Sequence, residues 1–181
     1  LSREFAHARR NNLLLRDLDE LVNQQLAKML FANPQRIDYY DRYQEIIDAY
    51  NAEQNRATIE KTFMDLMELA SSLDTEQQRY VREGFSSDEE LSVYDLLFSE
   101  NLTKQEIETI KKVSVDLLTK IKQQIAKLDH WTDKQETKAI VDNLIRNTLW
   151  QELPNSYDVS DIQTYQKKIY EYVYMRYPEV A

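Results

Sequence analysis

Residues 14–29 read LLRDLDELVNQQLAKM, and the apolar side chains of this stretch recur at helical spacing. The apolar positions are Leu14, Leu18, Leu21, Val22, Leu26 and Met29. These positions fall on one face of an α-helix, because a helix completes a turn about every 3.6 residues. The stretch therefore predicts a long, one-sided helix whose apolar face needs partner helices to cover it.

Two further stretches repeat this pattern. The second stripe contains Ile59, Phe63, Leu66, Met67 and Ala70. The third contains Ile107, Ile110, Leu117, Ile121, Ile125 and Leu128. A coiled coil competes as an account of the first and third stripes, but neither keeps a strict heptad repeat over three heptads. Packing of these helices within one bundle is favoured.

Capping signals divide the chain into about eight helices. Asn33-Pro34 is a helix start, because Asn caps well and the missing N–H of proline costs nothing in a first turn. Four capping boxes mark further starts: Ser87 with Glu90, Thr103 with Glu106, Thr132 with Gln135, and Ser160 with Gln163. Gly84, the only glycine, suits the left-handed residue that ends a helix, here one beginning near Asp74 or Thr75.

The composition supports an all-α fold, an irregular multi-helix bundle of about eight helices in a single domain. One glycine and three prolines among 181 residues leave few turn formers for a β-rich or Rossmann-like chain. No cysteine is present, which excludes disulfides and thiolate metal ligands and fits a cytoplasmic protein. Because the chain begins at Leu1 and has no apolar run of membrane length, we expect an excised piece of a larger cytoplasmic protein.

The net charge of −9 disfavours a general nucleic-acid binder, yet the charge is uneven. Residues 1–36, 101–122 and 163–177 each carry a net charge of +2, so the remainder carries −15. Basic strips on an acidic body therefore become candidate DNA contacts, although a solvated helix face is the commoner explanation of such strips. The candidate DNA-binding residues are Lys104, Lys111, Lys122, Lys167, Lys168 and Arg176.

Tyrosines crowd the last predicted helix. Tyr170, Tyr174 and Tyr177 recur at i, i+4 and i+7, so they share one side of that helix. Tyrosine beside arginine is typical of protein contacts and of base stacking. These three residues are candidate partner-binding residues, with packing at the rim of the core as the alternative.

No catalytic residue, metal ligand or cofactor site is predicted in this chain. Glu136 and Lys138, with the upstream aspartates, are residue types found in magnesium-dependent nuclease sites. In such sites a β-sheet normally aligns the carboxylates around the metal, whereas a helix is expected here. The two histidines, His7 and His130, have no metal-binding companion. A chain with one glycine cannot form a glycine-rich phosphate loop.

Several blocks resemble the C-terminal region of the R (HsdR) subunit of type I restriction enzymes. The most specific runs GFSSDEELSVYDLL over residues 84–97, and FMDLMELA at residues 63–70 precedes it. The stretch from LDHWT at residues 128–132 through Leu144, Leu149 and Pro154 is similar to the closing helices of that family. The lysine-rich and tyrosine-rich parts look closest to the IC class.

The resemblance implies a parent subunit that is an ATP-dependent DNA translocase and a type I site-specific deoxyribonuclease. The parent uses ATP and Mg, and none of its catalytic motifs is expected here. The resemblance further implies that this region holds the motor on the methyltransferase (M) and specificity subunits, with double-stranded DNA passing nearby. A purely structural bundle that supports the adjacent motor domains is the alternative, and a nuclease lobe is a third reading.

The whole chain, residues 1–181, is accordingly expected to be one helical assembly domain. Leading helices occupy residues 1–54, the part most like the family occupies residues 55–155, and a tyrosine- and lysine-rich terminal helix occupies residues 156–181.

Overall fold

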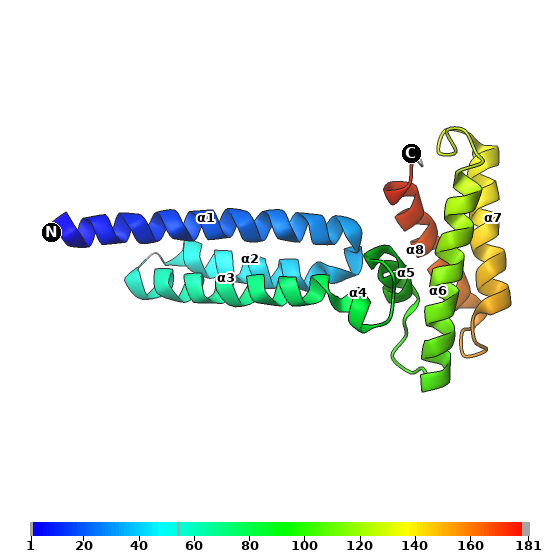
Figure 1. Cartoon of the computed structure of the whole chain (residues 1–181), viewed down its shortest axis with the longest axis horizontal. Helices are drawn as coiled ribbons and strands as arrows, with labels where there is room; N and C mark the ends of the chain where they lie inside the picture. Colours follow the sequence, from blue (N-terminus) through cyan, green and yellow to red (C-terminus); the bar gives the residue numbers. More distant parts are fainter. Residues whose placement is uncertain (1, 54, 179–181) are drawn as a thin grey trace. The chain divides into compact units, whose positions relative to one another are not determined.

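The helical fold class is confirmed. A computed structural model describes residues 2–53 and 55–178, with the backbone alone for residues 2–12, and within these ranges it contains eight α-helices, one short 3-10 helix and no strand. Figure 1 shows the helices in chain order. Among the described residues, no helix combines the length and apolarity needed to cross a membrane.

The helices form two compact units, Leu1–Arg82 and Glu83–Ala181. Unit 1 contains α1 (Ser2–Ala32), η1 (Pro34–Arg36), α2 (Ile37–Ala52), α3 (Arg56–Gln77) and α4 (Arg79–Arg82). Unit 2 contains α5 (Asp88–Leu97), α6 (Lys104–Ile125), α7 (Gln135–Glu152) and α8 (Val159–Arg176). The boundary between the units falls after Arg82, because α3 packs on α1 and α2 while α8 packs on α5 and α7.

Unit 1 is a bundle of three long helices. Figure 1 shows α2 and α3 alongside α1, whose N-terminal end extends past them. Gln25 of α1 donates to the Asp74 carboxylate of α3 at 2.6 Å, which fixes the register of this parallel pair. The buried core joins all three helices: Leu15, Val22, Leu26 and Met29 of α1, Tyr43 of α2, and Leu66, Leu69 and Leu73 of α3.

A buried ion-pair network links the elements of unit 1. The Arg36 Nε lies 3.0 Å from Glu76 Oε1, and only 3% and 8% of these two side chains are exposed. Arg79 adds a second guanidinium 2.9 Å from the same carboxylate oxygen. Because buried charges are costly unless they are paired, this contact fixes the turn before α2 against the end of α3.

Unit 2 packs around Trp131, which is 1% exposed in the loop between α6 and α7. The Trp131 Nε1 donates to the backbone carbonyl of Tyr177 at 2.6 Å, so the loop is tied to the end of α8. The tryptophan ring meets Tyr170 and Tyr174 edge to face, at centroid distances of 6.1 and 5.7 Å. This geometry suits the quadrupoles of aromatic rings.

Three of the predicted helix starts have side-chain caps. Asn33 accepts from the backbone N–H of Gln35, although a 3-10 turn precedes α2. Ser87 caps α5, and Thr103 with Glu106 forms a complete capping box on α6.

Two predicted starts are wrong by a few residues. The helix α7 begins at Gln135 rather than after Thr132, because the backbone turns at His130, whose φ is 45°, to bury Trp131. The helix α8 begins at Val159, where Asp158 and Asp161 form the capping box that was assigned to Ser160 and Gln163.

Gly84 ends a helical segment as predicted, with a φ of 84° that favours glycine. The segment it follows is the short α4, and the residues from Asp74 to Gln77 belong to the end of α3. The sequence signal therefore located the turn and misplaced the helix before it.

Candidate functional site

Unit 1 carries an apolar strip on one side of the α1 and α3 pair. We define this strip as Leu14, Leu21, Phe63, Met64 and Met67. Four of these side chains are exposed: Leu14 by 49%, Leu21 by 56%, Met64 by 68% and Met67 by 49%. Phe63 is half-buried and packs against the core.

The register of the two helices brings Leu14 of α1 beside the α3 residues of the strip. Because Gln25 lies opposite Asp74 in a parallel pair, Leu14 lies at the level of Phe63 and Leu21 at the level of Ala70. A groove of about 390 Å³ opens between the helices and is lined by Leu14, Ile59, Glu60, Phe63 and Met64. An apolar groove between two helices suits an amphipathic helix of a partner protein.

Sequence reasoning missed this strip. Leu14, Leu21 and Met67 fell in the apolar stripes that were expected to face partner helices. The structure buries Val22 and Leu66 of the same stripes, and it buries Leu15, which the first stripe did not include. The only sequence signal was the width of the stripes, which exceeds what one neighbouring helix can cover.

Three of the six candidate DNA-binding cations are engaged within unit 2. Lys111 lies 3.1 Å from the Glu83 carboxylate and donates to the Glu83 carbonyl at 3.0 Å. Its Nζ also lies 6.0 Å from the ring centroids of Phe85 and Tyr94. This ammonium therefore stabilises the start of unit 2.

Lys122 and Arg176 converge on Glu89. Lys122 pairs with the Glu89 carboxylate and lies 5.3 Å from the ring centroid of Tyr177. The Arg176 Nη2 lies 3.9 Å from the other oxygen of Glu89. This cluster joins α5, α6 and α8, so its cations neutralise a carboxylate of their own unit.

The other three candidate cations are exposed. Lys104 stands in the first turn of α6, and Lys167 and Lys168 stand on α8. Lys167 lies 3.9 Å from Glu171, a pair that is largely exposed and hence weak. Lys168 lies 5.6 Å from the ring centroid of Tyr165.

The three candidate partner-binding tyrosines differ in exposure. Tyr177 is buried, and its burial, together with the neighbouring Tyr172 and Glu89, raises the pKa of its phenol. Tyr170 is half-buried, and burial, followed by the Asp142 carboxylate, raises the pKa of its phenol. Tyr174 is 39% exposed, so it is the most accessible of the three.

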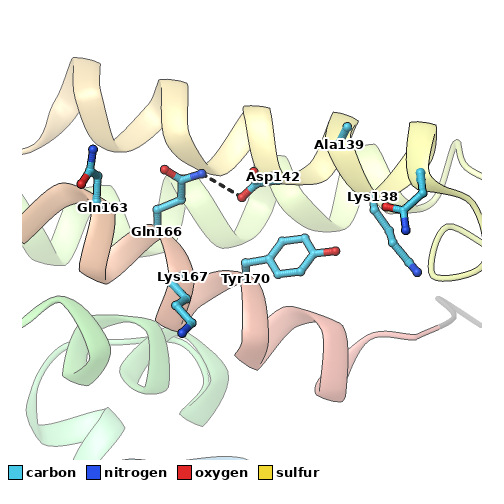
Figure 2. Close-up of a pocket in the computed structure, with 8 residues that line it drawn as sticks. Lys138, Ala139, Asp142, Gln163, Gln166, Lys167 and Tyr170 are labelled. Carbon is cyan, nitrogen blue, oxygen red and sulfur yellow. Dashed lines mark hydrogen bonds between the residues drawn. The ribbon is translucent and has the colours of Figure 1, made fainter.

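A polar groove of about 470 Å³ lies between α7 and α8 in unit 2. We call it the α7–α8 groove, and its lining consists of Gln135, Lys138, Ala139, Asp142, Gln163, Gln166, Lys167 and Tyr170. Gln166 donates to the Asp142 carboxylate at 2.8 Å across the groove. In the view of Figure 2, Tyr170 lies between this hydrogen-bonded pair and Lys138. Lys138 was not among the predicted DNA-binding residues.

The placement of Glu136 and Lys138 does not support a nuclease site. Glu136 is exposed in the first turn of α7, and the Lys138 Nζ lies 5.7 Å from the ring centroid of Tyr174. Within the part of the chain that the structure describes, no three His, Asp or Glu side chains gather in a way that could hold a metal ion.

The comparisons with known proteins agree with the resemblance. No curated protein and no solved structure matched the chain. The family model described as "Type I restriction enzyme HindI endonuclease subunit-like, C-terminal" matches residues 1–177. The match spans both units, and the chain therefore belongs to this family, the C-terminal region of type I restriction endonuclease subunits.

Proposed function

We propose that this chain is an assembly domain that joins the restriction subunit of a type I restriction enzyme to the methyltransferase core of the complex. The apolar strip of unit 1 carries the proposal. An exposed row of leucine and methionine side chains is unfavourable in water and becomes favourable when a partner covers it. Methionine is also common at binding surfaces because its side chain adapts its shape.

The proposed occupant of the strip is an amphipathic helix of the methyltransferase or specificity subunits. Glu60 lines the groove beside Leu14, Phe63 and Met64, which suits a polar edge on an apolar centre. The chain belongs to the C-terminal region of the endonuclease subunits of a multisubunit enzyme, and this membership supports a proposed contact with another subunit.

A second part of the proposal is a contribution to DNA binding. Its support is the exposure of Lys104, Lys167 and Lys168, the three candidate cations that are not held by strong internal ion pairs. The parent subunit is then an ATP-dependent translocase and endonuclease that uses ATP and Mg in domains outside this chain. The engagement of Lys111, Lys122 and Arg176 favours a structural role for those residues.

The test combines the full restriction subunit with its methyltransferase complex and measures complex mass by light scattering. Leu14→Glu with Met64→Glu introduces two carboxylates into the strip at exposed helical positions, so the fold should tolerate them. We expect at least a tenfold weaker association, because two buried charges would lack partners at the interface.

The matched control is Leu13→Glu with Ile37→Glu. These side chains are 46% and 51% exposed and lie outside the strip, so they add the same charge to a comparable surface. Equal association by the strip variant and the control would leave the structural bundle as the better reading of the chain.

A further inference from the structure

The α7–α8 groove combines three features that a nucleic-acid strand uses. Lys138 and Lys167 supply positive charge from two different helices. Tyr170 supplies an aromatic ring, and Gln135, Gln163 and Gln166 supply amide groups. Cations beside an aromatic ring and amides are typical of sites that hold a phosphate backbone while a base stacks.

The cations of this groove are available to a ligand. The Lys138 Nζ lies 5.7 Å from the ring centroid of Tyr174, a contact that leaves its charge without neutralisation by that neighbour. Lys167 has only the exposed contact with Glu171 at 3.9 Å. Lys111, Lys122 and Arg176, by contrast, each lie beside a carboxylate of unit 2.

The aromatic ring of the groove is held in place. Tyr170 meets the buried Trp131 edge to face at a centroid distance of 6.1 Å, and its ring is tilted against that of Tyr174 at 6.1 Å. A base stacking on this held ring would therefore cost little side-chain entropy. The antiparallel register set by Gln166 and Asp142 places Tyr170 opposite Lys138, one helical turn along the groove. A base against Tyr170 and a phosphate at Lys138 would thus lie at the same level of the groove.

Asp142 disfavours a phosphate and favours a base at the centre of the groove. Its carboxylate would repel a phosphate there, while the Asp142 and Gln166 pair offers an acceptor and an amide to a base edge. The backbone of a strand would therefore follow the lysines at the rim, and a base would point inward.

The net charge of unit 2 favours a single strand over a duplex as the ligand of the groove. Residues 83–181 contain 12 Lys and Arg against 18 Asp and Glu, a net charge of −6. A duplex carries a phosphate about every 1.7 Å and a single strand about every 3.4 Å, so an acidic unit repels a duplex more strongly. Bases in a duplex are also stacked inside the helix and cannot enter a groove between two protein helices.

We infer that the α7–α8 groove binds an unpaired segment of DNA, with Lys138 and Lys167 on the phosphates and Tyr170 against a base. This inference rests on the DNA-contact part of the proposed function and names its substrate as single-stranded DNA. It concerns a surface of unit 2, separate in sequence from the apolar strip of unit 1.

The experiment measures fluorescence anisotropy of a labelled twelve-nucleotide oligothymidylate with the 181-residue chain over a range of salt concentrations. Lys138→Gln with Lys167→Gln should weaken binding about tenfold in low salt and reduce the salt slope by roughly 1.4, because each phosphate contact contributes about 0.7 for a single strand. The control, Lys112→Gln with Lys127→Gln, removes the same charge from exposed lysines outside the groove and should leave affinity within about twofold.

Substitutions of Tyr170 test stacking separately from charge. Tyr170→Phe keeps the ring and should bind within about twofold of the parent chain. Tyr170→Leu should bind about tenfold more weakly with an unchanged salt slope, because base stacking is worth ~1–3 kcal/mol by substitution. Circular dichroism checks that both variants remain folded.

Four outcomes would overturn the inference. These are no binding of the oligonucleotide, equal losses in the groove variant and its control, a duplex that binds as tightly as the single strand, and displacement by polyglutamate at equal charge. The strip variant Leu14→Glu with Met64→Glu should leave oligonucleotide affinity unchanged. Failure of assembly and failure of strand binding are therefore distinguishable.

Discussion

Both units are helical and bury apolar cores, and they differ in the other groups that they bury and in the groove that each leaves open. Unit 1 buries an ion-pair network around Glu76 and leaves leucine and methionine side chains exposed. Unit 2 buries aromatic rings around Trp131 and leaves a polar groove with two accessible lysines. The comparison teaches that function in a helical bundle depends on which faces stay uncovered, since the helices themselves are alike.

The largest effect is expected when the aromatic centre of unit 2 is removed. Trp131→Ala deletes a side chain that is 1% exposed, together with its hydrogen bond to the Tyr177 carbonyl. Loss of a buried tryptophan costs about 4–5 kcal/mol of unfolding free energy. Urea denaturation monitored by the fluorescence of Trp150, the other tryptophan and also in unit 2, measures this loss.

The difference between the two units becomes clearer if Trp131→Ala leaves the stability of unit 1 unchanged. Unit 1 contains no tryptophan, so circular dichroism reports both units while fluorescence reports unit 2 alone. We expect part of the helical signal to unfold at its original urea concentration in Trp131→Ala. A single shifted transition by both methods would show that the units unfold as one. Trp150→Phe, at a side chain 48% exposed, is the control and should change stability little.

A somewhat smaller effect is expected when the buried network of unit 1 is broken. Glu76→Gln removes the carboxylate that faces Arg36 at 3.0 Å and Arg79 at 2.9 Å. The Arg36 side chain is 3% exposed, so its charge would stay buried without that partner, at a cost of about 3 kcal/mol. Circular dichroism during urea denaturation measures the loss, and tryptophan fluorescence should not change.

The double variant Arg36→Met with Glu76→Met provides the control for this prediction. Replacement of both partners by apolar side chains removes the buried charge as well as the pair. We expect the double variant to be more stable than Glu76→Gln. If it were less stable, the network would contribute more than the desolvation of its own charges.

Local sequence signals predicted the helices well. Ser87 caps α5, and Thr103 and Glu106 form the capping box of α6, as predicted. These caps can be predicted from sequence because a side-chain oxygen accepts hydrogen bonds from backbone N–H groups only two or three residues away. The start of α7 could not be predicted in the same way. Thr132 carries the cap signal, but burial of Trp131 in the core decides where the backbone turns.

The candidate sites were harder to predict because they depend on contacts distant in sequence. Lys111, Lys122 and Arg176 form a basic pattern along the chain, yet Glu83 and Glu89 meet them only after folding. Met67 belongs to a predicted apolar stripe and Met64 does not, yet both side chains are exposed in the structure. The width of the stripes indicates that part of an apolar face stays uncovered, but it does not indicate which residues lie there. The family, by contrast, could be recognised from the sequence without a structure, and the match over residues 1–177 confirms it.

The smallest effect concerns a single phenol in unit 1. Tyr43 is 5% exposed, donates to Asp19 at 2.8 Å and accepts from Asn23 at 3.1 Å. Burial first, and then the hydrogen bond to Asp19, raise the pKa of Tyr43 from 10.0 to about 12. Because the folded pKa lies above the unfolded one, the neutral phenol contributes full stability below about pH 10 and loses it as the pH rises toward 12.

Unit 1 should therefore lose about 1 kcal/mol of unfolding free energy between pH 9 and pH 11 through Tyr43 alone. Tyr43→Phe cannot ionise at this position and provides the comparison, because Tyr39, whose phenol pKa is also raised, is present in both proteins. Urea denaturation by circular dichroism at the two pH values should give a smaller decrease for the phenylalanine variant. An equal decrease in both proteins would show that groups other than Tyr43 cause the loss of unit 1 stability at high pH.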